Sequence, residues 1–439
     1  MRTRRSVPLL LCALFTIVVC LIPVQARAKM DWQKYTGTSI RVILNKHYWT
    51  DAITPLIPDF EKKTGIKVNV EVYPEAQFRQ KRDVELMAGN ADLDVFMTQS
   101  YSEGKKYYGA GWYTPLMPFI KDSALTEIKY TFPRDFSSSA IKDATINGDL
   151  VFIPVDTIFS VLFYRKDIFK DLKMNPPKTL IELLATAEKI ETATNGKIHG
   201  ITSRGKGAEA VGIFGNYLYS LGGTWEDKDK MPSINTPQAI EAFKYYGKLL
   251  GKYGPPGSLN NGFYEVGAAF MEGQAAMLTD GIGFVGQFEN KQNSKIAGKV
   301  GYQVFPAGTA GSKPLIGTWG IAVSGLSKKK EAAWLFVQYM SSAETSLHFL
   351  NAGGNTTRLS PWKSPQFTNA KADWIKAILN TYKVGVEGNY VPPSVKNVSL
   401  ARDIIGKVII TAIAGGNVEQ AANEAQNQLT KLYLEEKGK

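Results

Sequence analysis

The residues best suited to chemistry in this sequence are aromatic side chains in loops at the ends of predicted strands. A flat aromatic ring can cover the apolar C–H face of a sugar ring, while Asp, Asn, Gln and Arg side chains satisfy its hydroxyl groups. Core packing is the alternative for any single aromatic residue, so the argument depends on their shared position. The pattern favours non-covalent binding of a sugar-like ligand by Tyr48, Trp49, Tyr101 and Trp319.

Asp156 is a further candidate, in the stretch from Gly148 to Asp167. The stretch reads as a turn at 147–149, a short apolar run, a break at Pro154, and a second apolar run that ends at Tyr164. We therefore expect two strands that flank Asp156. Its carboxylate is either a hydrogen-bond partner for a polar ligand in a cleft or part of an ordinary turn. Spacing alone favours the turn, because Asp forms local hydrogen bonds there.

Motifs of catalytic or metal chemistry are mostly absent from the sequence. It contains no G-x-S-x-G and no H-E-x-x-H motif, and its histidines are too dispersed to predict a metal cluster. We therefore predict no catalytic residue, no metal site and no cofactor. The histidines are His47, His199 and His348.

One glycine motif, from Gly281 to Gly286, fits the G-x-G-x-x-G pattern of dinucleotide-binding loops. It follows a plausible strand, but no acidic residue lies near Val304, where the ribose of a dinucleotide would need one. A secreted protein also has little access to NAD. We interpret the motif as a tight turn from a strand into a helix at a cleft.

These candidates need a scaffold, and the first hundred residues predict a parallel sheet. The order strand, helix, strand, helix, strand implies right-handed crossovers between parallel strands. Ligands bind beyond the carboxyl ends of such strands, which selects the loops at 45–49 and 99–101 and adds Gln99 to the candidates. The predicted strands are 40–44, 66–72 and 94–97, and the helices lie before Gly65 and over 77–88.

The rest of the chain alternates helices with short strands. A Thr-x-x-Glu capping pattern at Thr179 and a Thr-Pro pair at Thr236 predict the starts of two helices. Further strands are expected at 275–279 and 300–305, and further helices at 266–270, from Ser327, at 400–414 and at 417–433.

Length and composition describe a globular protein with a secretory leader. At 439 residues the chain can form two or three domains or one large two-lobed body. Arginines precede an apolar run from Val7 to Val24, and Ala26-Arg27-Ala28 follows it. The pattern predicts a signal peptide cleaved after Ala28 rather than a membrane anchor, because Pro8 and Pro23 interrupt the run.

Cysteine content and charge exclude several further classes of protein. Cys12 and Cys20 both lie in the leader, so the mature chain is expected to contain no disulfide, thiolate metal site or thiol nucleophile. The net charge is +12 at pH 7, and four of the arginines lie in the leader. Lysines are scattered over predicted helix faces rather than gathered in one patch, so we predict no nucleic-acid partner.

Several sequence blocks, taken together in their order and spacing, resemble the extracellular solute-binding proteins of ABC importers. The similarity is to the sugar-binding branch typified by maltose-binding protein, and it covers nearly the whole mature chain. The blocks are FEKKTGIKVNVE (60–71), ADLDVF (91–96), GAGWYTPL (109–116), GDLVFIPVDT with LFYRKDIF (148–169), PPKTLIEL (176–183), EGQAAMLTDG (272–281) and GTWGIAVS with KKKEAAWLF (317–336).

The resemblance implies a two-lobed α/β periplasmic-binding-protein fold, in which each lobe has a mainly parallel sheet flanked by helices and crossovers between the lobes form a hinge. The implied crossovers lie near 141–145, 305–315 and 352–358. The implied N-terminal lobe comprises 29–144 and 316–352, and the implied C-terminal lobe comprises 145–315 and 353–439.

The resemblance also implies a function. It implies a periplasmic protein that captures a sugar or polyol by hinge closure and delivers it to an ABC permease, acting as a monomer and without covalent chemistry. A secreted glycan-active enzyme and a ferric or other small-solute binding protein are the alternatives. A contact between Phe284 and the ligand is left open. The loops implied to face the cleft hold Trp49, Tyr101, Asp156, Asp280, Trp319 and Arg358.

Overall fold

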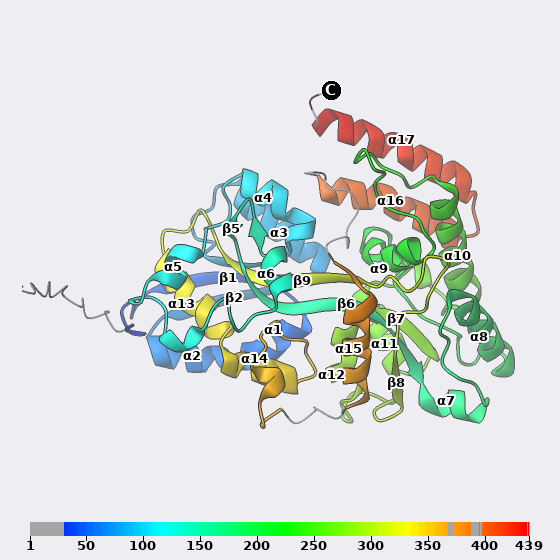
Figure 1. Cartoon of the computed structure of the whole chain (residues 1–439), viewed down its shortest axis with the longest axis horizontal. Helices are drawn as coiled ribbons and strands as arrows, with labels where there is room; N and C mark the ends of the chain where they lie inside the picture. The colour runs from blue at the N-terminus through cyan, green and yellow to red at the C-terminus, as the bar shows by residue number, and fades with distance from the viewer. Residues whose placement is uncertain (1–29, 368–371, 388–394, 396, 437, 439) are drawn as a thin grey trace, which may run out of the picture.

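The structure is a computed structural model that describes residues 30–367, 372–387, 395, 397–436 and 438. The expected leader, residues 1–28, lies outside the described residues. Two lobes of helices and strands lie side by side, and the N-terminal part of the chain forms most of one lobe (Figure 1). This arrangement agrees with the two-lobed α/β class expected from the sequence.

The first lobe contains the predicted parallel strands. β1 (Ser39–Asn45) pairs with β2 (Lys67–Tyr73) on one side and with β3 (Val95–Thr98) on the other, and all three run in the same direction. α2 (Ile57–Thr64) and α3 (Glu75–Met87) form the crossovers between them. The order of strands and helices predicted for this part of the chain is confirmed.

The helical stretch between β1 and β2 is divided into short segments. α1 (Tyr48–Ile53) leads through a 3₁₀ turn, Thr54–Leu56, into α2. Pro55 and Pro58 each lie in the first turn of a segment of their own, where the missing N–H costs no helical hydrogen bond. Gly65 ends α2 with a φ of +71°, a left-handed conformation that a residue without a Cβ adopts readily.

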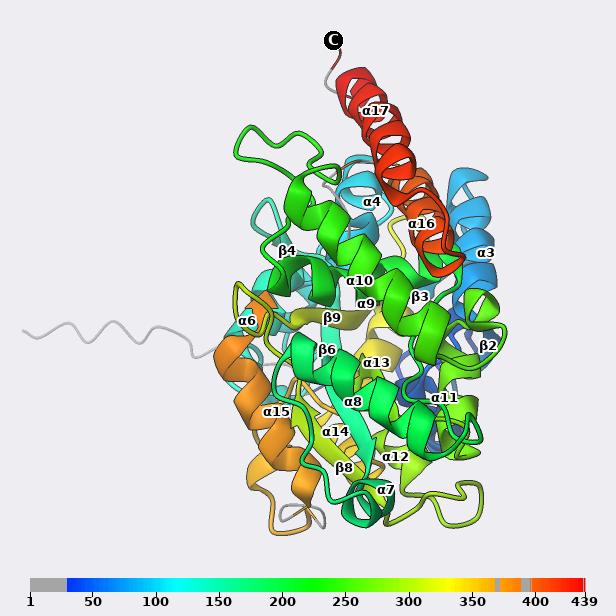
Figure 2. The same cartoon turned by 90° about the vertical axis from the view of Figure 1, so that its right-hand side faces the viewer.

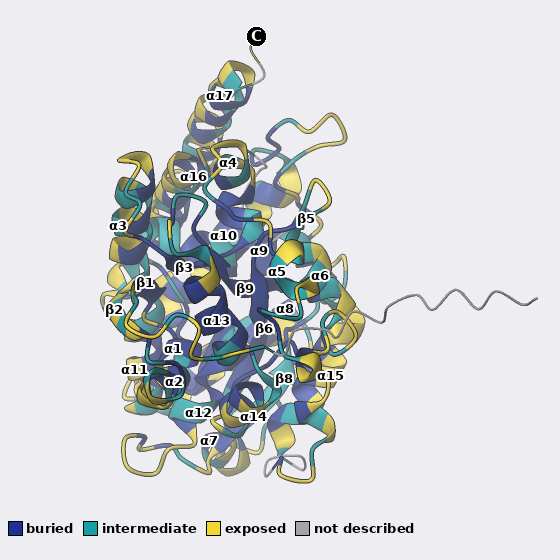
Figure 3. Cartoon of the chain, turned by 90° about the vertical axis from the view of Figure 1, so that its left-hand side faces the viewer, coloured by how far each residue is buried: buried dark blue, intermediate teal, exposed yellow. Residues whose placement is uncertain are grey.

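Two long strands connect the lobes. β6 (Ile153–Arg165) is antiparallel to β9 (Leu315–Val323), and β9 is also antiparallel to β3. Both strands are buried along most or all of their length (Figure 3). β6 continues through Pro154 with a register shift before Asp156, so the predicted break at Pro154 is wrong. Proline is tolerated there because it lies at the start of the strand and beside an irregularity.

Side chains of these two strands pack in both lobes. In β6, Val155 belongs to the core of the first lobe and Phe159 to a core of the second lobe. In β9, Trp319 belongs to the first-lobe core and Ile316 to the second-lobe core. The segment 355–357 runs beside β6 and bonds to it. The hinge therefore contains two paired strands. The lobe boundaries expected from the sequence remain a proposal.

Strand directions differ between the two lobes. β7 (Met277–Gly281) and β8 (Val300–Val304) both pair antiparallel with the second half of β6. Parallel pairing in this lobe is seen in isolated bridges, such as the one from Thr202 to Leu278, and in β10 (Val386–Glu387), which pairs with β9. The difference arises because β6 enters the second lobe directly from the hinge rather than through a helical crossover.

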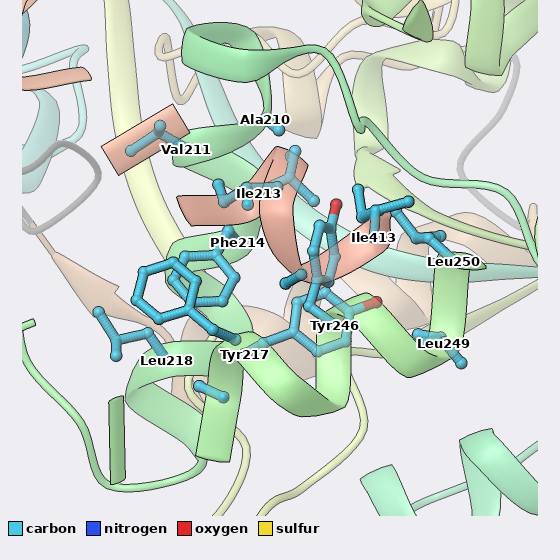
Figure 4. Close-up of a cluster of buried hydrophobic side chains, with 14 of the residues drawn as sticks. Ala210, Val211, Ile213, Phe214, Tyr217, Leu218, Tyr246, Leu249, Leu250 and Ile413 are labelled. Atoms are coloured by element: carbon cyan, nitrogen blue, oxygen red, sulfur yellow. The ribbon is translucent and has the colours of Figure 1, made fainter. Parts of the chain in front are cut away.

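Aromatic rings fill the core of the second lobe. Phe214 stacks on Phe243 with ring centroids 4.2 Å apart, and Tyr217 packs across Tyr246 at 4.8 Å (Figure 4). Burial of each large apolar side chain contributes about 1.5 to 3 kcal/mol. The core is enclosed by α9 (Gly207–Ser220), α10 (Pro237–Tyr253) and α16 (Val398–Ile413) (Figure 2).

The remaining elements cover the sheets. Thr179 and Thr236 cap their helices as predicted, each accepting a hydrogen bond from a backbone N–H three residues later. The remaining elements of the first lobe and hinge are α4 (Lys105–Gly109), α5 (Met117–Lys121), α6 (Ser138–Asp143), the hairpin of β4 (Thr145–Ile146) and β5 (Asp149–Leu150), α13 (Lys330–Met340) and α14 (Ala343–Asn351). The remaining elements of the second lobe are α7 (Lys166–Asp171), α8 (Leu180–Ala193), α11 (Phe263–Met271), α12 (Val285–Phe288), α15 (Asp373–Val384) and α17 (Val418–Glu436).

Candidate functional site

A cavity of about 310 Å³ lies between the two lobes. Its first-lobe wall is formed where β1, β2 and β3 end, because parallel strands bring their carboxyl ends to one edge of the sheet. Ile158 of β6 and Trp319 of β9 contribute from the hinge. The first-lobe wall consists of 45–48, 74–77, Arg79, Gln99 and Tyr101, and the second-lobe wall of residues from 204–213, 263–265, 280–281 and Arg402.

The structure brings together most of the residues selected from the sequence, although they come from distant parts of the chain. The residues that line the cavity are Tyr48, Gln99, Tyr101, Asp280 and Trp319. The selected residues that do not line it are Trp49, Asp156 and Arg358.

Trp49 lies in the first-lobe core and is only 1% exposed. The sequence places it in a loop, but α1 begins at Tyr48, and its N-cap His47 accepts a hydrogen bond from the Trp49 backbone. Successive helical residues point about 100° apart. Tyr48 therefore lines the cavity while Trp49 packs into the core.

Asp156 is fully buried within β6, so it is not the turn residue favoured by spacing, and it does not reach the cavity. The Tyr48 hydroxyl donates a hydrogen bond to its Oδ2 atom, and His47 Nε2 lies 3.8 Å from the same atom. Asp156 thus holds in place a tyrosine that does line the cavity. Its connection to a ligand is indirect.

Burial decides the charge states of Asp156 and His47. It raises the pKa of Asp156 to about 8, against the opposing effects of the Tyr48 hydroxyl and the Asn355 backbone. Burial also lowers the pKa of His47 to about 3, although the charge of Glu75 acts in the opposite direction. At neutral pH the acid is therefore largely protonated and the imidazole is neutral.

Arg358 lies outside the cavity. It is 1% exposed, donates to Asp135 Oδ2 at 2.6 Å and to the backbone oxygen of Ser341 at 2.6 Å, and packs over the Phe136 ring. It contributes to a separate cavity of about 510 Å³ on the first lobe. The expected position of Arg358 at the cleft is therefore corrected: its guanidinium anchors the segment after α14 to the first lobe.

The glycine motif at 281–286 forms a strand-to-helix turn beside the cavity, as interpreted from the sequence. Its middle glycine, Gly283, lies against the Tyr48 ring, and a Cβ there would come within 1.9 Å of it. The motif thus allows the two lobes to approach closely. Phe284 stacks on Phe263 at 4.3 Å and is 1% exposed, so it supports the wall from behind.

Arginines and carboxylates that were not selected from the sequence complete the walls. Arg79 donates to Glu75, to Glu103 at 2.8 Å and to Gln99 at 2.8 Å. Across the cavity, Arg204 forms a bidentate pair with Asp280, with distances of 2.8 and 2.7 Å. Bidentate Arg–carboxylate pairs are geometrically specific, and Arg79 is held by three partners, so both guanidinium groups are fixed before any ligand arrives.

Glu75 connects these two networks. Its Oε1 atom accepts from Arg79, and its Oε2 atom lies 4.0 Å from Arg204 Nη1. Burial by itself raises the pKa of Glu75, but the charges of Arg79, Arg402 and Arg204 together lower the pKa to about 2. Glu75 is therefore ionised throughout the neutral range.

Some of these residues have a signal in the sequence. Glu75 and Arg79 follow β2, and the rule that selected the loops after β1 and β3 applies equally to this strand. Arg204 and Arg402 have no such signal, because they lie in the second lobe and reach the cavity through tertiary packing.

Within the described ranges, no helix is long and apolar enough to cross a membrane. Among the same residues, no group of three or more His, Cys, Asp or Glu side chains is arranged to hold a metal ion.

The fold and the cavity define a class of protein. Two α/β lobes joined by paired hinge strands, with a polar and aromatic cavity between them, form a solute-binding protein of the kind that holds its ligand between lobes. The chain belongs to the family of bacterial extracellular solute-binding proteins, whose profile matches residues 46–346. It is accordingly a ligand-binding protein and not an enzyme.

Individual relatives agree with this assignment. An erythritol/L-threitol-binding protein of Mycolicibacterium smegmatis is 26% identical over 330 residues, which cover 72% of this chain and 69% of that protein. A solute-binding protein of Agrobacterium radiobacter, solved with ribitol, is 25% identical, has a TM-score of 0.82 and covers 90% of this chain and 99% of its own. One from Agrobacterium vitis, solved with D-mannitol, is 25% identical, with a TM-score of 0.81 and coverages of 91% and 99%.

Proposed function

We propose that this protein captures a small sugar or polyol in the cavity between its lobes and delivers it to an ABC permease. The observation that carries the proposal is the cavity itself, which both lobes line and which combines aromatic faces with hydrogen-bonding groups. Its volume of about 310 Å³ is near the lower end of the range for ligand sites. The relatives named for erythritol, or solved with ribitol and mannitol, support a ligand of this kind.

Hinge closure is part of the proposal. Tyr264 of the second lobe donates a hydrogen bond to the backbone oxygen of Lys46 in the first lobe, and Arg204 approaches Glu75 across the cavity. Such contacts exist when the lobes are close together. A ligand that touches both walls favours this closed arrangement, because it gains contacts that the open arrangement lacks.

The proposed ligand contacts are the lining residues selected from the sequence. Trp319 and Tyr48 offer ring faces, and Gln99 and Asp280 offer polar groups, although both are already hydrogen-bonded within the protein. Tyr101 lies on the first-lobe wall. We further propose a periplasmic monomer whose leader is removed after Ala28.

A titration with erythritol, ribitol, mannitol and maltose tests the function. We expect at least one of these solutes to change intrinsic tryptophan fluorescence, because Trp319 lines the cavity. The same solute should raise the free energy of unfolding by about 2.7 kcal/mol at 100 times its dissociation constant. If none of a broad panel of sugars and polyols changes either signal, the proposed ligand class is wrong.

Two matched variants locate the site. Tyr101→Ala removes a tyrosine that lines the cavity, and we expect its affinity for that solute to fall about tenfold. Tyr108→Ala removes a tyrosine of the same lobe that bonds to Asp149 and does not line the cavity. Equal losses of affinity in the two variants would contradict the proposed site.

A further inference from the structure

One of the three arginines of the cavity wall differs from the other two. Arg402, on α16, donates its Nε hydrogen to the Ala208 backbone oxygen at 3.0 Å. Within the part of the chain that the structure describes, no carboxylate or carbonyl accepts from its two Nη groups. Arg402 lines both the main cavity and a second cavity of about 350 Å³ between α3, α9 and α16. Its Nη donors are therefore available to a small molecule.

The other two arginines of the cavity are paired. Arg204 is held by Asp280, and Arg79 is held by Glu75, Glu103 and Gln99. Glu75 interacts electrostatically with all three arginines, but it already accepts a hydrogen bond from Arg79. Among the described residues, Arg402 thus lacks a carboxylate partner of its own.

The charges of the lining residues do not balance. His47 is neutral at pH 7, because burial lowers its pKa to about 3. Five cationic side chains then face four carboxylates, which leaves a surplus of one positive charge. The cations are Lys46, Arg79, Arg204, Lys206 and Arg402, and the carboxylates are Glu75, Glu209, Glu265 and Asp280.

The surroundings of Arg402 disfavour its charge. Burial lowers the pKa of Arg402, and the positive charge of Arg79 across the cavity lowers it further, while Glu75 acts in the opposite direction. Arg402 is half-buried, and a cation partly removed from water without a partner carries a desolvation cost that an anion with good hydrogen-bond geometry offsets. A carboxylate matches the planar fork of a guanidinium group.

We propose that the ligand is a small polyhydroxylated monoanion, a sugar acid of the aldonate class, whose carboxylate pairs with the Nη groups of Arg402. This inference rests on the proposed function and narrows its ligand class. The hydroxyl groups of the ligand lie against the aromatic and polar residues of the first-lobe wall. The carboxylate contacts the second lobe, so the ligand bridges both lobes and holds them together.

Isothermal titration of the full-length mature protein with matched pairs of ligands tests the inference. Gluconate and glucitol share a six-carbon chain, ribonate and ribitol share a five-carbon chain, and the members of each pair differ chiefly in the carboxylate. We expect at least one acid to bind about tenfold more tightly than its alditol. We also expect the affinity of the acid, but not that of the alditol, to fall as salt is added, since salt screens charge pairs.

Two charge-removing variants on the same helix locate the anion site. Arg402→Gln should lower the affinity for the acid about tenfold and leave that for the alditol within about twofold. Lys407→Gln removes a charge from an exposed position of α16 outside the cavity and should change neither affinity. The salt dependence of the unmodified protein tests the inference even if Arg402→Gln fails to fold.

The outcomes separate the inference from the function on which it rests. Alditol binding that equals or exceeds acid binding overturns the inference and leaves the proposed function intact. An equal loss for acid and alditol in Arg402→Gln also overturns it, because the arginine then recognises hydroxyl groups. Absence of binding for all four ligands, in a protein that binds no other sugar or polyol, overturns both.

Discussion

The two walls of the cavity are built differently. The first-lobe wall comes from three consecutive loops between residues 45 and 101, and its Glu75 and Arg79 are paired within the lobe. The second-lobe wall is assembled from segments as distant as Arg204 and Arg402, and it carries the guanidinium group whose Nη atoms have no described acceptor. Under the proposed function, the first wall would provide a fixed surface for ligand hydroxyls. The second wall would provide selectivity.

The largest effect is expected from breaking the buried ion pair that supports the first-lobe wall. Glu103 is 7% exposed and accepts from Arg82 at 2.6 Å and from Arg79 at 2.8 Å. Glu103→Ala leaves Arg82, itself 1% exposed, without its main partner. We expect a loss of about 3 to 5 kcal/mol in the free energy of unfolding, measured in urea.

A surface pair on α3, the helix that carries Arg82, is the control for that experiment. Lys81 pairs with Glu85 at 2.7 Å, and its side chain is 39% exposed. Lys81→Met should barely change the urea midpoint, because exposed pairs contribute little. If Glu103→Ala were as stable as Lys81→Met, the first wall would not depend on its buried network.

The paired arginine of the second wall provides the next test. Asp280→Ala removes the bidentate partner of Arg204, and Asp280 itself is fully buried. Leaving a buried charge without its hydrogen bonds costs more free energy than leaving a neutral group without them. We therefore expect the affinity for the ligand to fall more than tenfold. Arg204→Met in the Asp280→Ala background should recover part of the loss. Affinity unchanged from wild type in Asp280→Ala would show that the second wall is not pre-organised by this pair.

Asp156, which lies behind the first-lobe wall, predicts that the free energy of unfolding depends on pH. The pKa of Asp156 is about 8 in the folded protein, against about 3.9 in an unfolded chain. Its contribution to stability is therefore complete below about pH 4 and is lost as the pH rises towards 8. We expect the free energy of unfolding of wild type, relative to Asp156→Asn, to decrease between about pH 4 and pH 8.

Guanidinium unfolding curves of the two proteins at several pH values measure that difference. Comparison with Asp156→Asn cancels the titration of His47 to first order, because His47 is present in both proteins. Parallel pH profiles would mean that Asp156 is ionised in the folded protein, and the first wall would then contain a buried negative charge.

The smallest expected effect comes from the contact between the walls. Tyr264→Phe removes a hydroxyl that donates to the Lys46 backbone oxygen across the cavity. The bond exists when the lobes are close, so its loss should weaken ligand binding by about 1 kcal/mol, mainly through faster dissociation. Tyr302→Phe, whose hydroxyl donates to Glu289 away from the cavity, is the matched control. Stopped-flow fluorescence would measure both rates.

Parts of the fold and site could be predicted from the sequence because they depend on local patterns. Alternating and helical periodicities located β1, β2, β3 and the long helices, and the rule for parallel strands selected Tyr48, Gln99 and Tyr101. The same reasoning failed for Trp49, because the loop after β1 turns at once into a helix whose next residue faces the core.

The sequence by itself determined the class of the protein: its two-lobed α/β fold, its membership of a solute-binding family and the aromatic character of its site. Only the tertiary structure decided which side chains meet at the cavity. Arg204, Asp280 and Arg402 converge there, and Asp156 and Arg358 are buried elsewhere. The physical reason is that periodicity records which side of its own element a residue faces, whereas a binding wall depends on how distant elements pack.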